Sequence, residues 1–356
     1  MRAVVLVVTL AACGRFGFGE SDPSTDDANP TNDATDGQAP VATPQFCDDR
    51  VITTLPIGAL DATAIRAVAL DNGYAVAVEA VDTSIRLLEL DNAGVLIATH
   101  GVFAAGYTPL YGMSKHDDRP AVHMQISGTS YLKFLDPGWA SYTTGPSGDP
   151  SMIDPAYAHI GPDVGVAARI SGGDFHVGLV DDAALNAITD ATYMPTTVVS
   201  GSIVPVPGGA RVAVEKAGGV CETFVVDAAN QARDVHTFSP CYAPKVAAVD
   251  DTSGVIVHRT DTVGPYAIHL IPAIANDTGS TVPLSGATYA RAAKRSDGAV
   301  WIGHGSGSYR ALLRVTPSGV MTELREDTAA FYFDLTERDA FWYDGATVHV
   351  STPCLR

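Results

Sequence analysis

A unit of about 45 residues recurs along the chain, and this repeat limits the fold more than any other feature. Its first landmark is a short apolar strand that follows a tight turn. The seven copies of this strand begin at Ala75, Ala121, Gly165, Ala210, Gly254, Ala299 and Ala340, at intervals of 46, 44, 45, 44, 45 and 41 residues. Turns such as Asp71-Asn72-Gly73 precede these strands and are typical of β-hairpins.

A second landmark, an apolar strand that ends in a turn, has the same period. Its turns contain Asp91, Asp136, Asp181, Asp227, Pro272 and Thr316, which lie 45, 45, 46, 45 and 44 residues apart. Each unit holds four short strands, and four strands in about 40–50 residues are the signature of a β-propeller blade. The sequence therefore predicts an all-β fold, a seven-bladed β-propeller of four-stranded antiparallel blades. Six or eight blades are the alternatives.

The motifs of common propeller families are missing from these repeats. There is no pairing of Gly-His with Trp-Asp as in WD40 repeats, and the Gly-Gly pairs lie at non-equivalent positions, unlike those of kelch repeats. Residues 296–303 resemble the Asp-Gly-x-x-Trp-Ile-Gly repeat of bacterial sensor propellers and, slightly, the sialidase Asp-box. Only one unit carries this motif, which indicates a hairpin with a packed tryptophan rather than a catalytic group.

The first thirteen residues have the parts of an export signal. Met1-Arg2 precedes an apolar run over residues 3–12, which is too short to span about 30 Å of hydrocarbon as a helix. The run ends in Leu10-Ala11-Ala12-Cys13, which resembles the bacterial lipobox. The resemblance implies cleavage before Cys13 and lipidation of that cysteine, and Gly14 after it favours the outer membrane. The alternative is an ordinary signal peptide with a chance cysteine.

An acidic stretch follows the lipobox. Residues 20–49 contain no Lys or Arg and eight acids, which are Glu20, Asp22, Asp26, Asp27, Asp33, Asp36, Asp48 and Asp49. Such a composition cannot bury enough apolar surface to fold, so it predicts a solvated, disordered tether. We therefore expect a signal peptide over residues 1–12, a lipidated cysteine and tether over 13–46, and a single propeller over 47–356. No other apolar run is long enough for a transmembrane helix.

Four cysteines remain after lipidation of Cys13, and outside the cytoplasm they allow two disulfides in three pairings. The seventh unit lacks its outer strand, and we expect residues 51–58 to supply it. A bond between Cys47 and Cys354 would then close the ring, while Cys221 and Cys241 would face each other across the outer hairpin of the fourth unit. A zinc site is the alternative, but no Cys-x-x-Cys pair is present.

Ligands of propellers usually bind on the face that carries the connections into each first strand and those between the second and third strands. The candidate ligand-face residues predicted there are Arg66, Tyr107, Tyr111, Tyr157, Arg169, Tyr242, Lys245, Tyr289, Arg291, His304 and Tyr332. The tyrosines would stack on sugar rings or apolar peptide groups. The alternative, which we prefer, is that they seal the contacts between neighbouring blades.

The net charge and the absence of known motifs exclude several kinds of partner and active site. The net charge of −18 argues against a nucleic-acid partner, because phosphate binding needs clustered cations. The Gly-His-Gly-Ser-Gly segment around Ser306 lacks the strand–turn–helix context of a nucleophile elbow. No His-Glu-x-x-His or His-x-His spacing occurs, so we expect no metal and no cofactor, with calcium in the Asp-rich loops as the alternative.

These observations favour a non-enzymatic function and name no catalytic residue. We expect an exported, lipid-anchored monomer whose rigid propeller face binds a protein or glycan partner. One alternative is an enzyme that acts on extracellular glycans through acids such as Glu79, Glu215, Asp261 or Asp344. Another is a structural component of the cell envelope. Two perturbed carboxylates that converge in one cleft would favour the enzyme.

Overall fold

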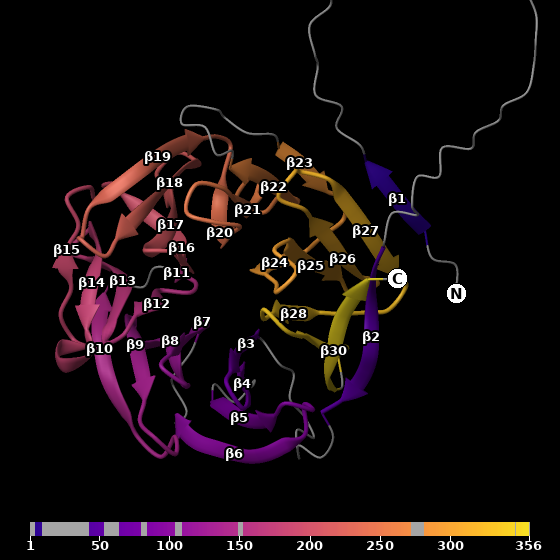
Figure 1. Ribbon diagram of the computed structural model, residues 1–356, viewed down its shortest axis with the longest axis horizontal. Helices are drawn as coiled ribbons and strands as arrows, with labels where there is room; N and C mark the ends of the chain where they lie inside the picture. Colours follow the sequence, from indigo (N-terminus) through magenta and orange to yellow (C-terminus); the bar gives the residue numbers. More distant parts are fainter. Residues whose placement is uncertain are drawn as a thin grey trace, which may run out of the picture.

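Seven antiparallel sheets follow one another around a central axis in the computed structural model (Figure 1). The structure describes residues 4–8, 43–52, 64–79, 84–103, 109–148, 152–271, 281–345 and 347–355. Each sheet is one blade, and its strands run outward from the axis in chain order, apart from three strands near the N-terminus or between blades that are described below. The predicted seven-bladed propeller is confirmed. The first landmark of the repeat lies in the second strand of each blade, and the second landmark ends the third strand.

The blades take up the described chain in order. Blade 1 comprises β3 (Ala64–Leu70), β4 (Gly73–Glu79), β5 (Ile85–Asp91) and β6 (Leu96–Phe103). Blade 2 comprises β7 (Leu110–His116), β8 (Arg119–Ile126), β9 (Thr129–Leu135) and β10 (Tyr142–Gly148). Blade 3 comprises β12 (Tyr157–Gly161), β13 (Val164–Ser171), β14 (Asp174–Asp181) and β15 (Thr189–Asp190), with the short 3-10 helix η1 (Asp182–Ala184) before β15.

The remaining blades complete the circle. Blade 4 comprises β16 (Val198–Val206), β17 (Gly209–Lys216), β18 (Val220–Asp227) and β19 (Ala232–Phe238), and β11 (Met152–Ile153) lies parallel to β16. Blade 5 comprises β20 (Tyr242–Ala248), β21 (Gly254–Arg259), β22 (Tyr266–Ile271) and β23 (Thr281–Leu284). Blade 6 comprises β24 (Tyr289–Lys294), β25 (Val300–Ser306), β26 (Tyr309–Val315) and β27 (Met321–Glu326). Blade 7 comprises β28 (Tyr332–Leu335), β29 (Ala340–Tyr343) and β30 (Val348–Leu355), with β2 (Pro44–Val51) as its outer strand.

The hydrophobic core lies between neighbouring blades. Val76 of blade 1 packs in one cluster with Phe341 and Val350 of blade 7, and Val166 of blade 3 packs in another with Val212 of blade 4. Both faces of each sheet are therefore covered, which explains why β4 and β17 are buried along nearly their whole length rather than at alternate residues. The ring has to close for the first and last blades to cover each other.

Strand β2 closes the ring by pairing antiparallel with β30, as the missing outer strand of the seventh unit predicted. The predicted position of the strand was wrong, because it comprises Pro44–Val51 rather than residues 51–58. It thus begins before the expected start of the propeller at residue 47. Residues 53–63 lie outside the described part of the chain.

Side chains that the composition assigned to the tether hold β2 in place. The ring of Phe46 lies 4.0 Å from the guanidinium carbon of Arg310, whose Nη2 lies 3.0 Å from a carboxylate oxygen of Asp49. Cys47 is bonded to Cys354 of β30, with their Cα atoms 6.0 Å apart. These contacts explain the correction, because pairing of residues 44–51 with β30 brings Cys47 within bonding distance of Cys354.

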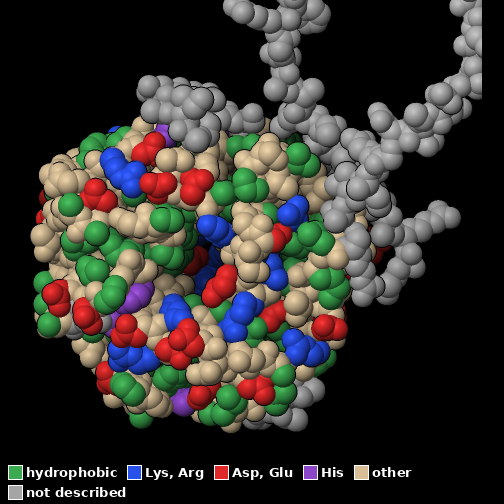
Figure 2. Space-filling model, viewed as in Figure 1, with side chains coloured by type: hydrophobic (Ala, Val, Ile, Leu, Met, Phe, Trp, Pro, Cys, Tyr) green, Lys and Arg blue, Asp and Glu red, His purple; other side chains and the backbone are tan. Residues whose placement is uncertain are grey.

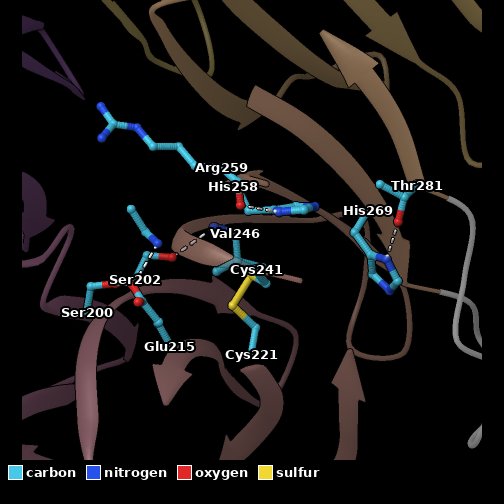
Figure 3. The surroundings of a disulfide bond; sticks show 11 residues. Ser200, Ser202, Glu215, Cys221, Cys241, Val246, His258, Arg259, His269 and Thr281 are labelled. Atoms are coloured by element: carbon cyan, nitrogen blue, oxygen red, sulfur yellow. Dashed lines mark hydrogen bonds between the residues drawn. A yellow bond between two sulfur atoms is a disulfide. The ribbon is translucent and has the colours of Figure 1, made fainter. Parts of the chain in front are cut away.

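The second disulfide joins blade 4 to the start of blade 5. Cys221 of β18 is bonded to Cys241, which directly precedes β20, with a Cα separation of 5.5 Å. Figure 3 shows Glu215 and Ser202 beside this bond, where each accepts a hydrogen bond of 2.8 Å from a backbone amide of β20. Both predicted disulfide pairings are confirmed. The predicted position of Cys241 was wrong, because Cys221 faces Phe238 across the hairpin and Cys241 lies beyond the end of β19.

Strand β1 (Val4–Val8) pairs antiparallel with β27, outside blade 6 (Figure 1). Blade 6 already has four strands without it, like the other blades. Within the described residues, the structure has no helix with the length and hydrophobicity needed to cross a membrane.

Candidate functional site

A cavity of about 740 Å³ lies on the axis of the ring and is lined by the first strands of all seven blades. Figure 2 shows a hollow at the centre of the ring, with Lys and Arg side chains (blue) and acidic side chains (red) gathered around it. Its volume is within the range of about 300–1,000 Å³ that is usual for small-molecule sites. The cavity extends from the middle of the first strands to the turns that follow them, where Ser296 and Glu337 line it.

Three cations from separate blades meet one carboxylate at the inner end of this cavity. The Oδ2 atom of Asp154 lies 3.1 Å from Nζ of Lys245, 3.0 Å from Nη2 of Arg291 and 3.4 Å from Nε of Arg66. The exposed fraction of the Asp154 side chain is 8%, and those of Lys245, Arg291 and Arg66 are 11%, 17% and 14%. We call these four residues the axial cluster.

Local pairing explains how the acid reaches the axis. Strand β11 lies parallel to β16, and the backbone amide of Asp154 donates a 2.8 Å hydrogen bond to the carbonyl of Gly201. Three cations on the first strands β3, β20 and β24 then surround the carboxylate. A buried cation needs such a partner, because the cost of removing it from water is otherwise several kcal/mol.

The environment moves the pKa values of the two acids at this end, Asp154 and Asp334, in opposite directions. They are two perturbed carboxylates in one cavity, the feature expected of the enzyme alternative, but each already has protein partners: three cations for Asp154 and the backbone amides of Ala67 and Leu335 for Asp334. Burial raises the pKa of Asp154, but the charges of Lys245, Arg66 and Arg291 outweigh burial and hold it well below its usual range. Burial raises the pKa of Asp334, although Arg66 and Arg291 oppose the shift. The Oδ2 atom of Asp334 accepts a 2.8 Å hydrogen bond from the backbone of Ala67.

Two bases beside Asp154 are perturbed as well. Burial lowers the pKa of Lys245 to about 8, although Asp154 opposes the shift. Burial also lowers the pKa of His123 to about 4, so this imidazole is neutral at pH 7. At that pH the axial cluster carries more positive than negative charge, which suits it to bind an anion.

The outer end of the cavity, which we call the mouth, carries a second set of cations. Lys294, Arg295 and Arg338 line it and donate hydrogen bonds to backbone carbonyls of neighbouring blades. Arg295 also lies over the ring of Trp301, and Arg338 lies over that of Tyr74. In the described part of the chain, none of the three cations forms an ion pair.

Three of the predicted ligand-face residues, Arg66, Lys245 and Arg291, are thus brought together on the axis. The mouth, however, lies on the face that carries the turns between the first and second strands. That face is opposite to the one on which the sequence placed the ligand. The rule for propeller ligands therefore predicted the face with the connections into each first strand, whereas the cavity opens on the opposite face.

Most of the predicted tyrosines lie in contacts within and between blades. Tyr157 is fully buried, with its hydroxyl between His116 and His159. The ring of Tyr111 packs against His123, and the ring of Tyr289 stacks on Phe333.

The other predicted positions are also spread around the ring. Tyr332 stacks on Tyr343 within blade 7, and Tyr242 packs against the backbone of Gly219. Tyr107 lies outside the described residues. Arg169 is half-buried in β13, and buried His304 of β25 lies 2.8 Å from a carboxylate oxygen of Glu323.

The four acids of the enzyme alternative hold local structure on four separate blades. The carboxylate of Glu79 accepts a hydrogen bond from the amide of Leu110, and Glu215 accepts one from Ser200. Asp261 and Asp344 accept hydrogen bonds from amides of their own loops. Within the described chain, no group of three or more His, Cys, Asp or Glu side chains could hold a metal ion.

Sequence reasoning missed Asp154 and Asp334, although a signal for them existed. Arg66, Lys245 and Arg291 are charged residues within first strands, which form the innermost layer of a propeller. Aligning the repeats by strand would have shown three cations near one axis, and buried cations require a counter-charge. Asp334 in the first strand of blade 7 would then have been the first acid to examine.

Comparison with known proteins supports the fold. No family model matches the sequence, and no curated protein matches it either. Hydrazine synthase of Kuenenia stuttgartiensis is similar in structure, with a TM-score of 0.58 and 11% identity over 82% of this chain and 96% of that chain. The propeller of Dos1 gives a TM-score of 0.51 and 12% identity over 78% of this chain and 75% of that chain. At such identities the likeness shows a shared β-propeller fold and nothing further.

Proposed function

We propose that the chain is an exported, lipid-anchored binding protein whose propeller holds a ligand in its axial cavity. The observation that carries this proposal is the cavity itself, which combines the volume of a ligand site with a buried charged cluster at its inner end. Seven first strands form its walls, and two disulfides elsewhere in the ring hold the blades together, so the site is formed in advance of binding. A preformed site loses little conformational entropy when the ligand binds.

Export and anchoring are supported by three independent features. The lipobox-like Leu10–Cys13 segment precedes an acidic stretch, and both disulfides suit an oxidising compartment. Removal of residues 1–12 would take away β1 and leave four strands in blade 6, as in the other blades. The propeller thus does not need this segment to complete a blade. We propose the outer membrane as the destination.

Replacing Cys13 with serine should move the protein from the membrane fraction to the soluble fraction of the envelope. The thiol of Cys13 would no longer be available for acylation, and the acyl chains are what hold the protein in the membrane. Fractionation followed by mass spectrometry of the N-terminal peptide measures both outcomes. Gly14→Ala is the matched control and should stay with the membrane. Sedimentation of Cys13→Ser with the membranes would contradict the anchor.

A photo-crosslinker placed at the mouth should capture the ligand of the intact, membrane-bound protein. Glu337 is exposed at the mouth, whereas Val263 is exposed on the opposite face and Val235 on the outer edge of blade 4. We expect p-benzoylphenylalanine at position 337 to form an adduct that is absent at positions 263 and 235. Gel mobility reveals a protein adduct, and mass spectrometry reveals a glycan or a small molecule.

The three positions separate the outcomes of this experiment. An adduct at position 263 alone would place binding on the face that the sequence predicted, and the axial cavity would lose its role. No adduct at any position would contradict a binding function. Thermal melts of each variant check that the propeller is intact.

A further inference from the structure

We propose that the axial cavity binds an organic acid, a ligand with a carboxylate group and an apolar body. This inference rests on the proposed function and names the class of ligand. It follows from the distribution of charge along the axis, the composition of the cavity walls and an unpartnered donor beside the axial cluster.

The charge of the cavity is opposite to that of the whole molecule. The chain has a net charge of −18, yet the cavity lining contains more cations than acids. The cations are Lys115, Lys245, Arg291, Lys294, Arg295 and Arg338, and the acids are Asp154, Asp334 and Glu337. Lys115 is already paired with Asp71 and Asp118, but the three cations of the mouth are not paired in the described chain. A low-dielectric recess lined by one sign of charge concentrates ions of the other sign.

The inner end of the cavity still has a donor to offer. Arg291 lines the cavity, and its Nε is buried with no hydrogen-bond partner among the described residues. Asp154 is shared among three cations, and Asp334 is occupied by the backbone amides of Ala67 and Leu335. A ligand carboxylate placed against Arg291 would supply an acceptor for its Nε, next to the Asp154 oxygen that Arg291 and Lys245 already share. Charge-assisted hydrogen bonds of this kind are the strong ones.

The wall between the two sets of cations is apolar. Aliphatic side chains and a methionine form it, among them Ala67, Met113, Ile203, Val246 and Leu335. A hydrophilic anion such as inorganic phosphate would leave this wall without a partner. An aliphatic or aromatic acid would bury its body against the wall and gain the free energy of removing apolar surface from water.

The test uses 8-anilinonaphthalene-1-sulfonate, a fluorescent organic anion with an apolar body, as the probe on the intact propeller. We expect saturable binding at one site, displaced by decanoate and unaffected by decanol or decyltrimethylammonium at the same concentration. Binding should weaken as salt increases, because the cations of the mouth are screened. Equal displacement by decanol would overturn the assignment of an acid and leave an apolar cavity only.

Substitutions localise the site. Arg291→Gln should weaken decanoate binding about tenfold or more, as expected for a lost charge-assisted hydrogen bond. Arg233→Gln, a matched removal of a cation from the outer strand β19, should leave binding unchanged. Should Arg291→Gln fail to fold, two single variants at the surface replace it. Lys294→Gln should weaken decanoate binding, and Glu337→Gln should strengthen it. Unchanged affinity in both surface variants and no salt dependence would overturn the proposal.

The pH dependence gives a further readout. Lys245 faces Asp154, Arg66, Arg291 and His123, and burial lowers its pKa to about 8. Its positive charge is therefore lost as the pH rises through about 8, while His123 stays neutral throughout. Decanoate should bind more weakly at pH 9.5 than at pH 7, and Lys245→Met should remove this difference. If crosslinks form at position 337 but the probe does not bind, the organic acid is rejected and the proposed function is retained. If neither crosslinks nor probe binding are seen, the organic acid and the proposed function are both rejected.

Discussion

Replacement of Cys47 and Cys354 by alanine should lower the free energy of unfolding by up to about 5–6 kcal/mol. The bond spans 307 residues, and the chain-entropy relation assigns that much stabilisation to a loop of this length. The bond also joins the first described strand of the propeller to its last, β2 to β30. Its loss would let β2 separate, which would expose the edge of β30 to pairing with other chains.

The second disulfide provides the matched control. Cys221 and Cys241 are 20 residues apart, so the same relation gives about 3 kcal/mol for Cys221→Ala with Cys241→Ala. Denaturant unfolding of both double variants measures the difference. A third protein, truncated before Pro44, keeps β2 and should unfold like the parent. The closure argument would fail if the truncation were as damaging as loss of the Cys47–Cys354 bond.

Replacing Asp154 with asparagine should destabilise the propeller by about 3–5 kcal/mol at pH 7. The change keeps the volume of the side chain and removes the charge that Arg66, Lys245 and Arg291 share. Breaking a buried ion pair by removing one partner costs that much because the other partner stays charged in a low-dielectric site. Asp261→Asn, in an exposed loop, is the control and should change stability by less than about 1 kcal/mol.

The difference in stability between the parent and Asp154→Asn should depend on pH. The pKa of Asp154 is lower in the folded protein than in the unfolded chain, so its contribution is fully present above about pH 4. The contribution is lost as the pH falls and the folded protein must take up a proton. The gap between the parent and Asp154→Asn should therefore be constant near neutral pH and shrink below about pH 4. An equal gap at pH 3 and pH 7 would show that packing rather than charge is responsible.

The double variant Asp154→Asn with Lys245→Met separates charge from geometry further. Removing one of the three cations relieves part of the unbalanced charge, so this protein should be more stable than Asp154→Asn alone. Additive losses would mean that the two side chains act independently.

The number of blades and the pairing of the cysteines could be predicted from the sequence. Both depend on local patterns, because hairpin turns such as Asp71-Asn72-Gly73 set where each strand begins, and a constant spacing then places equivalent strands at equivalent positions. Cys221 and Cys241 could be paired for the same reason, since they flank one hairpin.

Which segment closes the ring, and on which face the axial cavity opens, depend on contacts that exist only in the folded protein. Residues 51–58 are the more apolar stretch, whereas residues 44–51 include three charged side chains. The choice between them rests on contacts with residues about 260 to 300 positions away, such as Arg310 and Ser351. The axial cluster is decided in the same way, because Asp154 meets Arg66, Lys245 and Arg291 only once seven blades have closed around one axis. The energy of an ion pair depends on the distance between the two charges in space. The sequence does not give that distance for residues on different blades.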